Sequence, residues 1–532
     1  MGRAIALNKR IVTEATPEGL LRLVADELPN FNDVNVSTAF STFNKLRGSK
    51  SFPRNIAADD GFRGLMALAR TMCADGRLDL QAVANIVHAV AKMSAAGKLA
   101  TADSGVQDTL AALEQRVVRV ASDMEPQGVS NTVYSFAVLG RQPGAETRAA
   151  LEAAVVRESP DMVPQAVANT AWSYATLGLM PRAKARAALQ AAVARVGPGM
   201  VPRAVANTAW SFATLGLMPG VEARVALEVA VVRVGPGMVP QAVANTAWSF
   251  ATLRLMPGAE ARAALQAAVV RVGPGMVRQA AANTAWSFAT LGLMPGAEAQ
   301  AALEAAVVRT SPSMKPHELV NTLWSLLTLA ATRDVPLPAC YPSLWRAAGG
   351  LDVGSFKDVE RIMMFHASMM HTELVSRDVL EEVTFPPWIM HEAREAWMRN
   401  AREDATVPTW VKDVASIIDE LGVRCEVECL SECSKFSIDV YLPVDEVAIE
   451  FDGPTHFINT SDGGKEGAPG DASRTTTKTP STELRDMFLR RRYRTVLSVP
   501  YYEWDALKGS AARSAYVVEK LRAVGVSIPA AP

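Results

Sequence analysis

The chain of 532 residues has few cysteines, few aromatic residues and almost no net charge. Five cysteines in this length, with no recognisable signal peptide, indicate a reducing compartment rather than a disulfide-stabilised secreted protein. The formal net charge of −1 gives no whole-chain sign of a polyanionic partner. No run of roughly 18 apolar residues is free of charge, Pro or Gly, so we expect no membrane span.

A targeting segment is equally hard to find. The first residues, MGRAIALNKRIVTEATPEG, contain three early basic side chains but soon reach Glu14 and Glu18. Transit peptides are poor in acidic residues, so this stretch makes a poor one as it stands.

The middle of the chain is a tandem repeat. The motif NTAWSFATLGLMPG recurs with a period of 38 residues, and its copies open at Asn131, Asn169, Asn207, Asn245, Asn283 and Asn321. A period of this length predicts a solenoid whose units bury a core by stacking on one another. Such an array presents a long face, which favours a binding protein over a compact enzyme.

Each repeat predicts an antiparallel pair of helices. Helix A, Pro164 to Leu177 in one copy, begins with a proline at its first turn and ends at Gly-Leu-Met-Pro. Helix B, about Ala183 to Val196, ends at Gly-Pro-Gly. The tryptophan of each copy lies beside a wide apolar stripe, so we expect the Trp and Asn of the motif to build the stack.

The positions that vary between copies are candidate ligand contacts. They fall at the ends of helix A, in its second position and at its glycine corner, and comprise Gln165, Arg203, Gln241, Arg254, Gln279 and His317. A row of arginines also recurs near the end of helix B, at Arg195, Arg233, Arg271 and Arg309. The row predicts either favourable contact with helix C-termini or a stripe that contacts phosphates. Residues 126–315 hold 16 Lys and Arg against 9 Asp and Glu, which weakly favours a phosphate-bearing ligand.

The helix motif Asn-Thr-x-Trp-x-x-Ala/Leu-x-Leu resembles the octotricopeptide repeat. That family comprises helical-pair solenoids of organelles that bind single-stranded RNA, roughly one nucleotide per repeat. The resemblance therefore implies a single-stranded RNA partner and a mitochondrial or chloroplast location. Because the central copies are nearly identical, they would read like bases at like positions, or follow a repetitive target.

The last part of the chain changes to an α/β pattern. The stretches SIDVYLP, AIEFDGPTHF, TELRDMFLRRRY and VLSVPYYEW resemble the RAP domain, which terminates helical-repeat proteins that process, stabilise or assemble organellar RNA. A Gly/Ser/Thr-rich segment between Asn459 and Lys478 departs from the shorter connection of that family. The resemblance implies RNA contact by this domain, and we assign it Arg485, Arg490, Arg491 and Tyr502 as candidate contacts.

This module also resembles nucleases of the PD-(D/E)xK type. Asp439 lies on one predicted strand, with Glu450 and Asp452 on the next, and carboxylates so placed could bind Mg²⁺ and activate water. His456 could assist as a base or ligand. The lysine usual two residues after the glutamate is absent, and Asp452 stands in its place.

The expected architecture is mainly helical. Residues 1–125 are divergent N-terminal repeats, 126–335 the regular array, 336–408 an irregular helical connector and 409–532 the RAP-like domain. The leading function is organellar RNA binding in RNA processing, stability or ribosomal RNA maturation, alongside other RNA-processing proteins and without a cofactor. A Mg²⁺-dependent endoribonuclease and a protein-binding scaffold are the alternatives.

Overall fold

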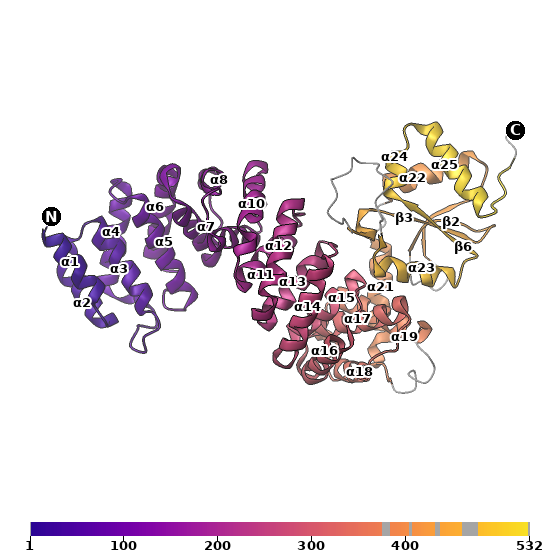
Figure 1. The fold of residues 1–532 in the computed structure, drawn as a ribbon, viewed down its shortest axis with the longest axis horizontal. Helices are drawn as coiled ribbons and strands as arrows, with labels where there is room; N and C mark the ends of the chain where they lie inside the picture. The colour runs from indigo at the N-terminus through magenta and orange to yellow at the C-terminus, as the bar shows by residue number, and fades with distance from the viewer. Residues whose placement is uncertain (1, 375–382, 404–406, 431–436, 460–476, 530–532) are drawn as a thin grey trace. The chain divides into compact units, whose positions relative to one another are not determined.

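The computed structural model describes the chain except residues 1, 375–382, 404–406, 431–436, 460–476 and 530–532. The described residues are mainly helical and end in a small strand-containing part, as the sequence predicts (Figure 1). They form two compact units, Met1–Val234 and Gly235–Pro532. The division falls inside the regular array and does not test the four segments expected from the sequence. Most of the Gly/Ser/Thr-rich segment lies outside the described residues.

In its described part the first unit consists of helices only, and in its repeats a helix A is followed along the chain by a helix B. They are α1 (Gly2–Thr13), α2 (Pro17–Glu27), α3 (Asp33–Leu46), α4 (Asp60–Ala74), α5 (Leu80–Ala95), α6 (Ser104–Val120), α7 (Pro126–Leu139), α8 (Ala145–Glu158), α9 (Pro164–Thr176), α10 (Ala183–Val196), α11 (Pro202–Thr214) and α12 (Val221–Val234). Short 3₁₀ turns join some of them, at Leu28–Asn30, Ile56–Ala58, Ala121–Asp123 and Gly197–Gly199.

The second unit contains the rest of the array and the α/β domain. Its helices are α13 (Pro240–Thr252), α14 (Ala259–Val272), α15 (Arg278–Leu291), α16 (Ala297–Thr310), α17 (Pro316–Arg333), α18 (Tyr341–Gly349), α19 (Asp358–Leu374), α21 (Glu392–Glu403), α22 (Thr409–Glu420), α23 (Pro480–Arg490), α24 (Tyr501–Ala506) and α25 (Ser510–Ala523). Its strands are β1 (Glu426–Leu430), β2 (Ser437–Leu442), β3 (Val447–Asp452), β4 (Phe457–Ile458), β5 (Thr477–Lys478) and β6 (Thr495–Pro500). Its 3₁₀ turns are Gly235–Gly237, Gly273–Gly275, Ser311–Ser313, Val353–Ser355, Pro387–Met390 and Pro454–His456.

Small side chains let the first helices of successive repeats, here called the A helices, pack closely. In α9, Thr170 and Ser173 are fully buried, and their hydroxyls donate to the carbonyls of Ala166 and Asn169, at 2.8 and 2.6 Å. The hydroxyls are therefore satisfied within their own helix, and burying them leaves no unpaired polar atom. This explains why Thr and Ser recur in the motif at buried positions.

The A helices end in a residue with a left-handed backbone conformation, and this residue is glycine in most regular repeats. The φ angles of Gly140, Gly178, Gly216 and Gly292 lie between 61° and 64°. In the repeat of α13 the corner is Arg254, with a φ of 49°. A side chain in this region costs on the order of 1–2 kcal/mol, so Arg254 is held there by other contacts.

The α/β domain is a four-stranded sheet of order β1-β2-β3-β6, covered on both faces by helices (Figure 1). β1, β2 and β3 are antiparallel neighbours, and β6 runs parallel to β3. One face packs on α22 and α25 through residues such as Ile449, Val414 and Leu521. The other packs on α23 through Ala448 and Leu489. β3 is buried along its whole length, so polar groups on it need internal partners.

Candidate nucleic-acid interface

Each regular A helix leaves one stripe of its surface uncovered. In α9 the stripe is Gln165, Asn169, Trp172 and Thr176, at positions i, i+4, i+7 and i+11 of one helical face. Gln165 and Thr176 are exposed, and Asn169 and Trp172 are partly exposed. The other faces of the helix pack on neighbouring A helices and on helix B.

The Asn and Trp of the motif are partly exposed in all regular repeats that carry them. The expectation that both build the stack therefore holds only in part, because each side chain also leaves some of its surface open. We call these residues the Asn–Trp rows, one in each compact unit. In the first unit the row is Asn169–Trp172 and Asn207–Trp210, preceded by Asn131–Tyr134 and Asn85–His88; in the second it is Asn245–Trp248, Asn283–Trp286 and Asn321–Trp324. The physical reason is that Ala, Thr, Ser and Phe fill the core, as Phe212 and Thr208 do in α11.

The side-chain amides of the row asparagines make no hydrogen bond within the described part of the chain. A carboxamide offers two donors and an acceptor in a plane. Side chains of this kind, repeated at one register beside an indole, can bond a base edge while the ring stacks on a base. The Asn–Trp combination recurs in the regular repeats from Asn169 to Asn321, whereas Tyr134 and His88 take the place of the indole at the start of the first row.

Aromatic rings of successive repeats approach one another at the start of the first row. The ring centroids of Tyr134 and Trp172 are 5.4 Å apart, and those of His88 and Tyr134 are 6.0 Å apart. The ammonium of Lys92 lies 4.6 Å from the centre of the Tyr134 ring and donates to its hydroxyl at 2.9 Å. The row in this unit therefore begins with a cation over an aromatic ring, an arrangement suited to a phosphate next to a stacked base.

The structure brings most of the variable positions onto the same stripe. These side chains are exposed and lie four residues before the row asparagines; they are Gln165, Arg203, Gln241, Gln279 and His317. A role in RNA contact stays a prediction, and the geometry places them on the same helical face as the row residues. Arg254 is different, because it lies at the helix corner rather than on the stripe.

The arginine row of helix B has a structural partner in every regular repeat. Nη2 of Arg195 donates to the carbonyls of Ser159 and Met162 at 2.9 and 2.7 Å. Arg309 bonds Gly273 and Met276 in the same way, at 3.2 and 2.7 Å. Equivalent bonds are made by Arg157, Arg233 and Arg271. Each arginine thus caps carbonyls at the end of the preceding repeat, and its predicted phosphate contact would have to be made in addition.

The carboxylates of the α/β domain meet basic groups from outside β3. Nη2 of Arg485 lies 2.7 Å from Oδ1 of Asp452, and Nη1 lies 3.0 Å from Oε2 of Glu450. Nζ of Lys478 lies 2.6 Å from Oδ2 of Asp452, and His456 contacts Oδ1 at 3.1 Å. The face of β3 toward α23 therefore holds carboxylates paired with basic groups, although Oε1 of Glu450 is buried without a hydrogen-bond partner in the described chain.

The pKa values of Glu450 and Asp452 are shifted in opposite directions. Burial would raise the pKa of Asp452, but bonds from His456, Lys478 and Ser498 and the charge of Arg485 hold it well below its usual range. Burial raises the pKa of Glu450 to about 8, because Arg485 opposes the desolvation only in part. Burial also raises the pKa of Asp439, whose Oδ2 accepts a hydrogen bond from the Phe451 amide at 2.6 Å.

These residues do not fit a Mg²⁺ site in this arrangement. The oxygens of Asp452 already face Lys478, Arg485 and Ser498, which occupy the directions a cation would take. Within the described ranges, no group of three or more His, Cys, Asp or Glu side chains is arranged to hold a metal ion. In this arrangement the oxygens of Asp452 are engaged by basic groups and a hydroxyl rather than open to a cation, and a catalytic role for Asp439, Glu450, Asp452 and His456 stays a prediction.

The candidate contacts at the end of α23 divide into different environments. Arg490 is exposed. Arg491 donates from Nη1 to the carbonyl of Glu373, so it also ties the domain to α19. Tyr502 is partly exposed, and its ring centroid lies 5.5 Å from that of Phe457. RNA contact by these residues stays a prediction.

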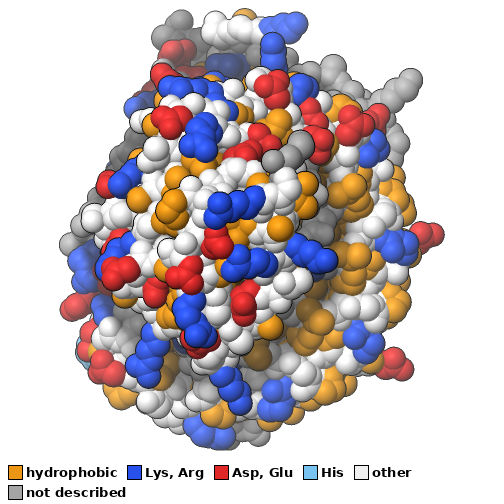
Figure 2. Space-filling view, turned by 90° about the vertical axis from the view of Figure 1, so that its left-hand side faces the viewer, with side chains coloured by type: hydrophobic (Ala, Val, Ile, Leu, Met, Phe, Trp, Pro, Cys, Tyr) orange, Lys and Arg blue, Asp and Glu red, His pale blue; other side chains and the backbone are white. Residues whose placement is uncertain are grey.

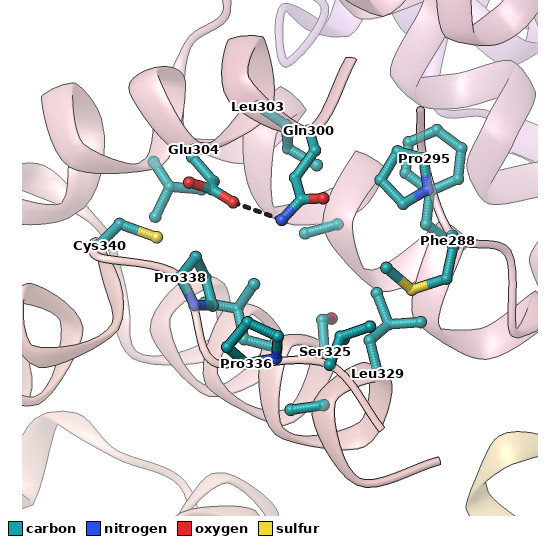
Figure 3. Close-up of a pocket in the computed structure, with 16 residues that line it drawn as sticks. Phe288, Pro295, Gln300, Leu303, Glu304, Ser325, Leu329, Pro336, Pro338 and Cys340 are labelled. Atoms are coloured by element: carbon teal, nitrogen blue, oxygen red, sulfur yellow. Dashed lines mark hydrogen bonds between the residues drawn. The ribbon is translucent and has the colours of Figure 1, made fainter. Parts of the chain in front are cut away.

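An apolar pocket lies near the end of the array (Figure 3). It lies between α15, α16, α17 and the segment 335–340, and its polar lining includes the bond from Gln300 to Glu304, at 2.8 Å. The lining includes Leu326, where the preceding repeats have Phe288, Phe250 and Phe212. An equivalent pocket in the first unit is lined by Tyr174 at the corresponding position. The smaller Leu326 therefore enlarges a space that the repeat already contains.

On the face shown in Figure 2, charge does not mark a binding surface. On the side seen in Figure 2, Lys and Arg are interspersed with Asp and Glu and form no large patch of one sign. The Asn–Trp rows are therefore identified by their chemistry and repetition rather than by a basic surface.

Within the described residues, no helix is both long enough and apolar enough to cross a membrane.

Fold and surface together define a helical-repeat solenoid with a terminal α/β domain. The RAP domain family matches residues 449–520, and the family described as Tbc2 translation factor, N-terminal domain, matches residues 61–179 and 164–331. The chain is a helical-repeat protein with a C-terminal RAP domain. The RAP domain is associated with RNA binding, which supports a general RNA-binding role.

Other comparisons add little. No curated protein matches the chain. A crystal structure of an engineered protein is similar at 13% identity over 74% of this chain and 98% of that one, with a TM-score of 0.18. A TM-score this low carries no argument about the fold.

Proposed function

We propose that the protein binds single-stranded RNA along the Asn–Trp rows. The observation that carries this proposal is the recurrence, in successive repeats, of a partly exposed indole next to a carboxamide that has no hydrogen-bond partner in the described chain. An unpaired base can stack on the indole and bond the carboxamide, and a single strand can repeat this from one repeat to the next.

Base selectivity comes from the position four residues before the asparagine. Because Asn and Trp are the same in the central repeats, they stabilise any base in a similar way. Arg203 offers donors only, and the Gln of neighbouring repeats offers donors and an acceptor. A strand is therefore held with little selectivity overall and is read mainly where this position changes.

The biological setting follows from the two halves of the chain. RAP domains and octotricopeptide-like repeats, which this chain resembles, belong to organellar RNA proteins, so we place it in a mitochondrion or chloroplast. There it acts in processing, stability or ribosomal RNA maturation, with other RNA-processing proteins as partners. The similarity of residues 61–331 to the Tbc2 translation factor family adds translation of a bound transcript to these outcomes.

Binding of an oligouridine strand, titrated with salt, tests the proposal. Trp286→Ala and Asn283→Ala remove a stacking surface and a base-edge contact from the second row. Stacking contributes about 1–3 kcal/mol per base, so Trp286→Ala should weaken binding about 5- to 150-fold. Asn283→Ala should cost less, because one neutral hydrogen bond contributes about 0.5–1.5 kcal/mol.

Asn400→Ala is the matched control, since Asn400 is an exposed asparagine on α21 that belongs to neither row. It should leave affinity unchanged. A wild-type protein that binds no RNA at low salt would refute the proposal and favour a protein-binding scaffold. Affinity that falls steeply with salt but ignores both row substitutions would place the RNA elsewhere on the chain.

A further inference from the structure

A cavity of about 210 Å³ lies where the array meets the RAP domain in the second unit. Its walls come from α17, α19 and α23. They consist of Trp324, His366, Met369, Met370, Ser481, Leu484, Arg485 and Phe488. It is far larger than the space of a single water, about 30 Å³.

The second Asn–Trp row runs into this cavity. Trp324 is the member of the row on α17, and the tryptophans on α13 and α15 precede it at intervals of 38 residues. Trp324 lines the cavity, whereas Trp248 and Trp286 do not. The row therefore changes from an open surface to a partly enclosed space at its final tryptophan.

The RAP domain is fastened to the ends of the A helices around this point. The amide of Asn459 donates to the carbonyl of Arg254 at 2.8 Å, and the amide of Met256 donates to the carbonyl of Asn459 at 3.1 Å. This pairing helps to hold Arg254 in the left-handed conformation that glycine adopts at the equivalent corner of other repeats. Further along, Nη1 of Arg333 lies 2.8 Å from Oε2 of Glu483.

A third fastening lies at the end of α19, where Nη2 of Arg492 contacts Oε1 of Glu373 at 2.6 Å. The helix corners at Arg254, Arg333 and Glu373 are thus each tied to the domain. Helix α23, which forms one cavity wall, packs against α17 and is tied to it by the ion pair of Arg333 with Glu483. These bonds hold the elements that form the cavity walls together at the junction between the array and the RAP domain.

The cavity walls suit an uncharged planar ring. Met369, Met370 and Phe488 supply apolar and sulfur surface, and Trp324 supplies an indole. Burial lowers the pKa of His366 to about 4, so its imidazole is neutral at physiological pH. The charge of Arg485 is already paired with Asp452 and Asp486, so the site does not call for a phosphate.

We propose that this cavity takes a single unpaired base at the end of the bound strand, stacked against Trp324. The RAP domain then acts as the end stop of the second row and fixes the register of the strand on the repeats. Ser481, which is exposed at the cavity, offers a hydroxyl to the base edge. This inference rests on the proposed RNA binding and assigns the RAP domain a specific part in it.

An abasic scan tests the cavity. The probe is an oligouridine strand of the shortest length that gives full affinity, with a single abasic nucleotide moved along it. In the wild-type protein, an abasic site at one terminal position should weaken binding about tenfold, within the range of one stacked base. Ser481→Tyr narrows the cavity from an exposed position and should remove the sensitivity of that terminal position alone.

Trp324→Ala should remove the same terminal sensitivity, and Trp286→Ala should remove that of an internal position instead. Circular dichroism and thermal unfolding establish that each variant is folded. If the strand binds but no terminal position is sensitive, or if terminal sensitivity survives in folded Ser481→Tyr, the cavity inference is overturned and row binding stands. If the wild-type protein binds no oligouridine, the proposed function fails first, and the inference fails with it.

Discussion

The arginine row of helix B provides a prediction that separates structure from RNA contact. Arg195→Met keeps the aliphatic stem and removes the guanidinium that bonds the carbonyls of Ser159 and Met162. A charge-assisted hydrogen bond contributes about 1.5–3 kcal/mol when its partner is left buried, but Arg195 is exposed on one side and water can replace part of the loss. We therefore expect a loss of about 1–2 kcal/mol in local stability.

Amide hydrogen exchange measures this loss where it occurs, which is preferable for a repeat array that need not unfold in one step. Amides of α8 and of the turn that follows it should exchange about 5- to 30-fold faster in Arg195→Met. RNA affinity should change by less than the exchange rate does.

Arg186→Met is the matched control, since Arg186 makes no such carbonyl bond among the described residues of its unit. It should leave exchange unchanged. Unchanged exchange in Arg195→Met, together with a large loss of RNA affinity and of salt dependence, would refute this reasoning. That result would make the row a phosphate stripe instead of an inter-repeat cap.

Three further predictions concern the second unit. Arg485→Ala leaves buried carboxylates without their main counterion and should destabilise the RAP domain by about 3–5 kcal/mol, measured by hydrogen exchange of the β3 amides; unchanged exchange would contradict the stabilising pairing of this cluster. The pKa of Glu450, about 8, lies above the roughly 4.3 of an unfolded glutamate, so the folded state binds more protons and loses stability as pH rises from about 4 through about 8. Glu450→Gln should therefore reduce the difference in thermal midpoint between about pH 5 and about pH 9, and an unaltered difference would count against the raised pKa. Leu326→Phe restores the ring found in preceding repeats and should raise the thermal midpoint by an amount equivalent to about 1 kcal/mol, whereas a lowered midpoint would mean that the segment 335–340 already fills the space.

The repeat architecture could be predicted from sequence because its signals are local. A 38-residue period, a proline at the start of helix A and glycine at its end define the helical pairs without knowledge of their packing. The motifs around Ile449 and Arg485 defined the RAP domain in the same way. These features depend on residues close together in the chain.

The exposure of the rows could not be predicted in this way, because the packing of three helices, not one, decides which face is covered. Trp172 lies next to Ala168 and Ala175 on the helix, so periodicity alone places it in the core. Gln165 and Asn169 supply the missing signal, since both are polar and share a helical face with Trp172. A polar pair in register with an aromatic residue indicates an exposed stripe.

The partners of charged side chains could not be predicted for a related reason. Arg195 bonds carbonyls 33 and 36 residues earlier, and backbone acceptors leave no mark in the sequence. The strand pattern placed the carboxylates Glu450 and Asp452 near one another, but Lys478 and Arg485 reach them only through the fold of β5 and α23. Their neutralisation removes the main support for a metal site.

Photocrosslinking of 4-thiouridine RNA, followed by mass spectrometry of the crosslinked peptides, tests the central claim most directly. The account predicts crosslinks on A-helix peptides that contain the row residues, such as Trp210 in the first unit and Trp286 in the second. It also predicts a terminal crosslink near Trp324. Crosslinks confined to helix B, or to the RAP domain face away from α17, would contradict it.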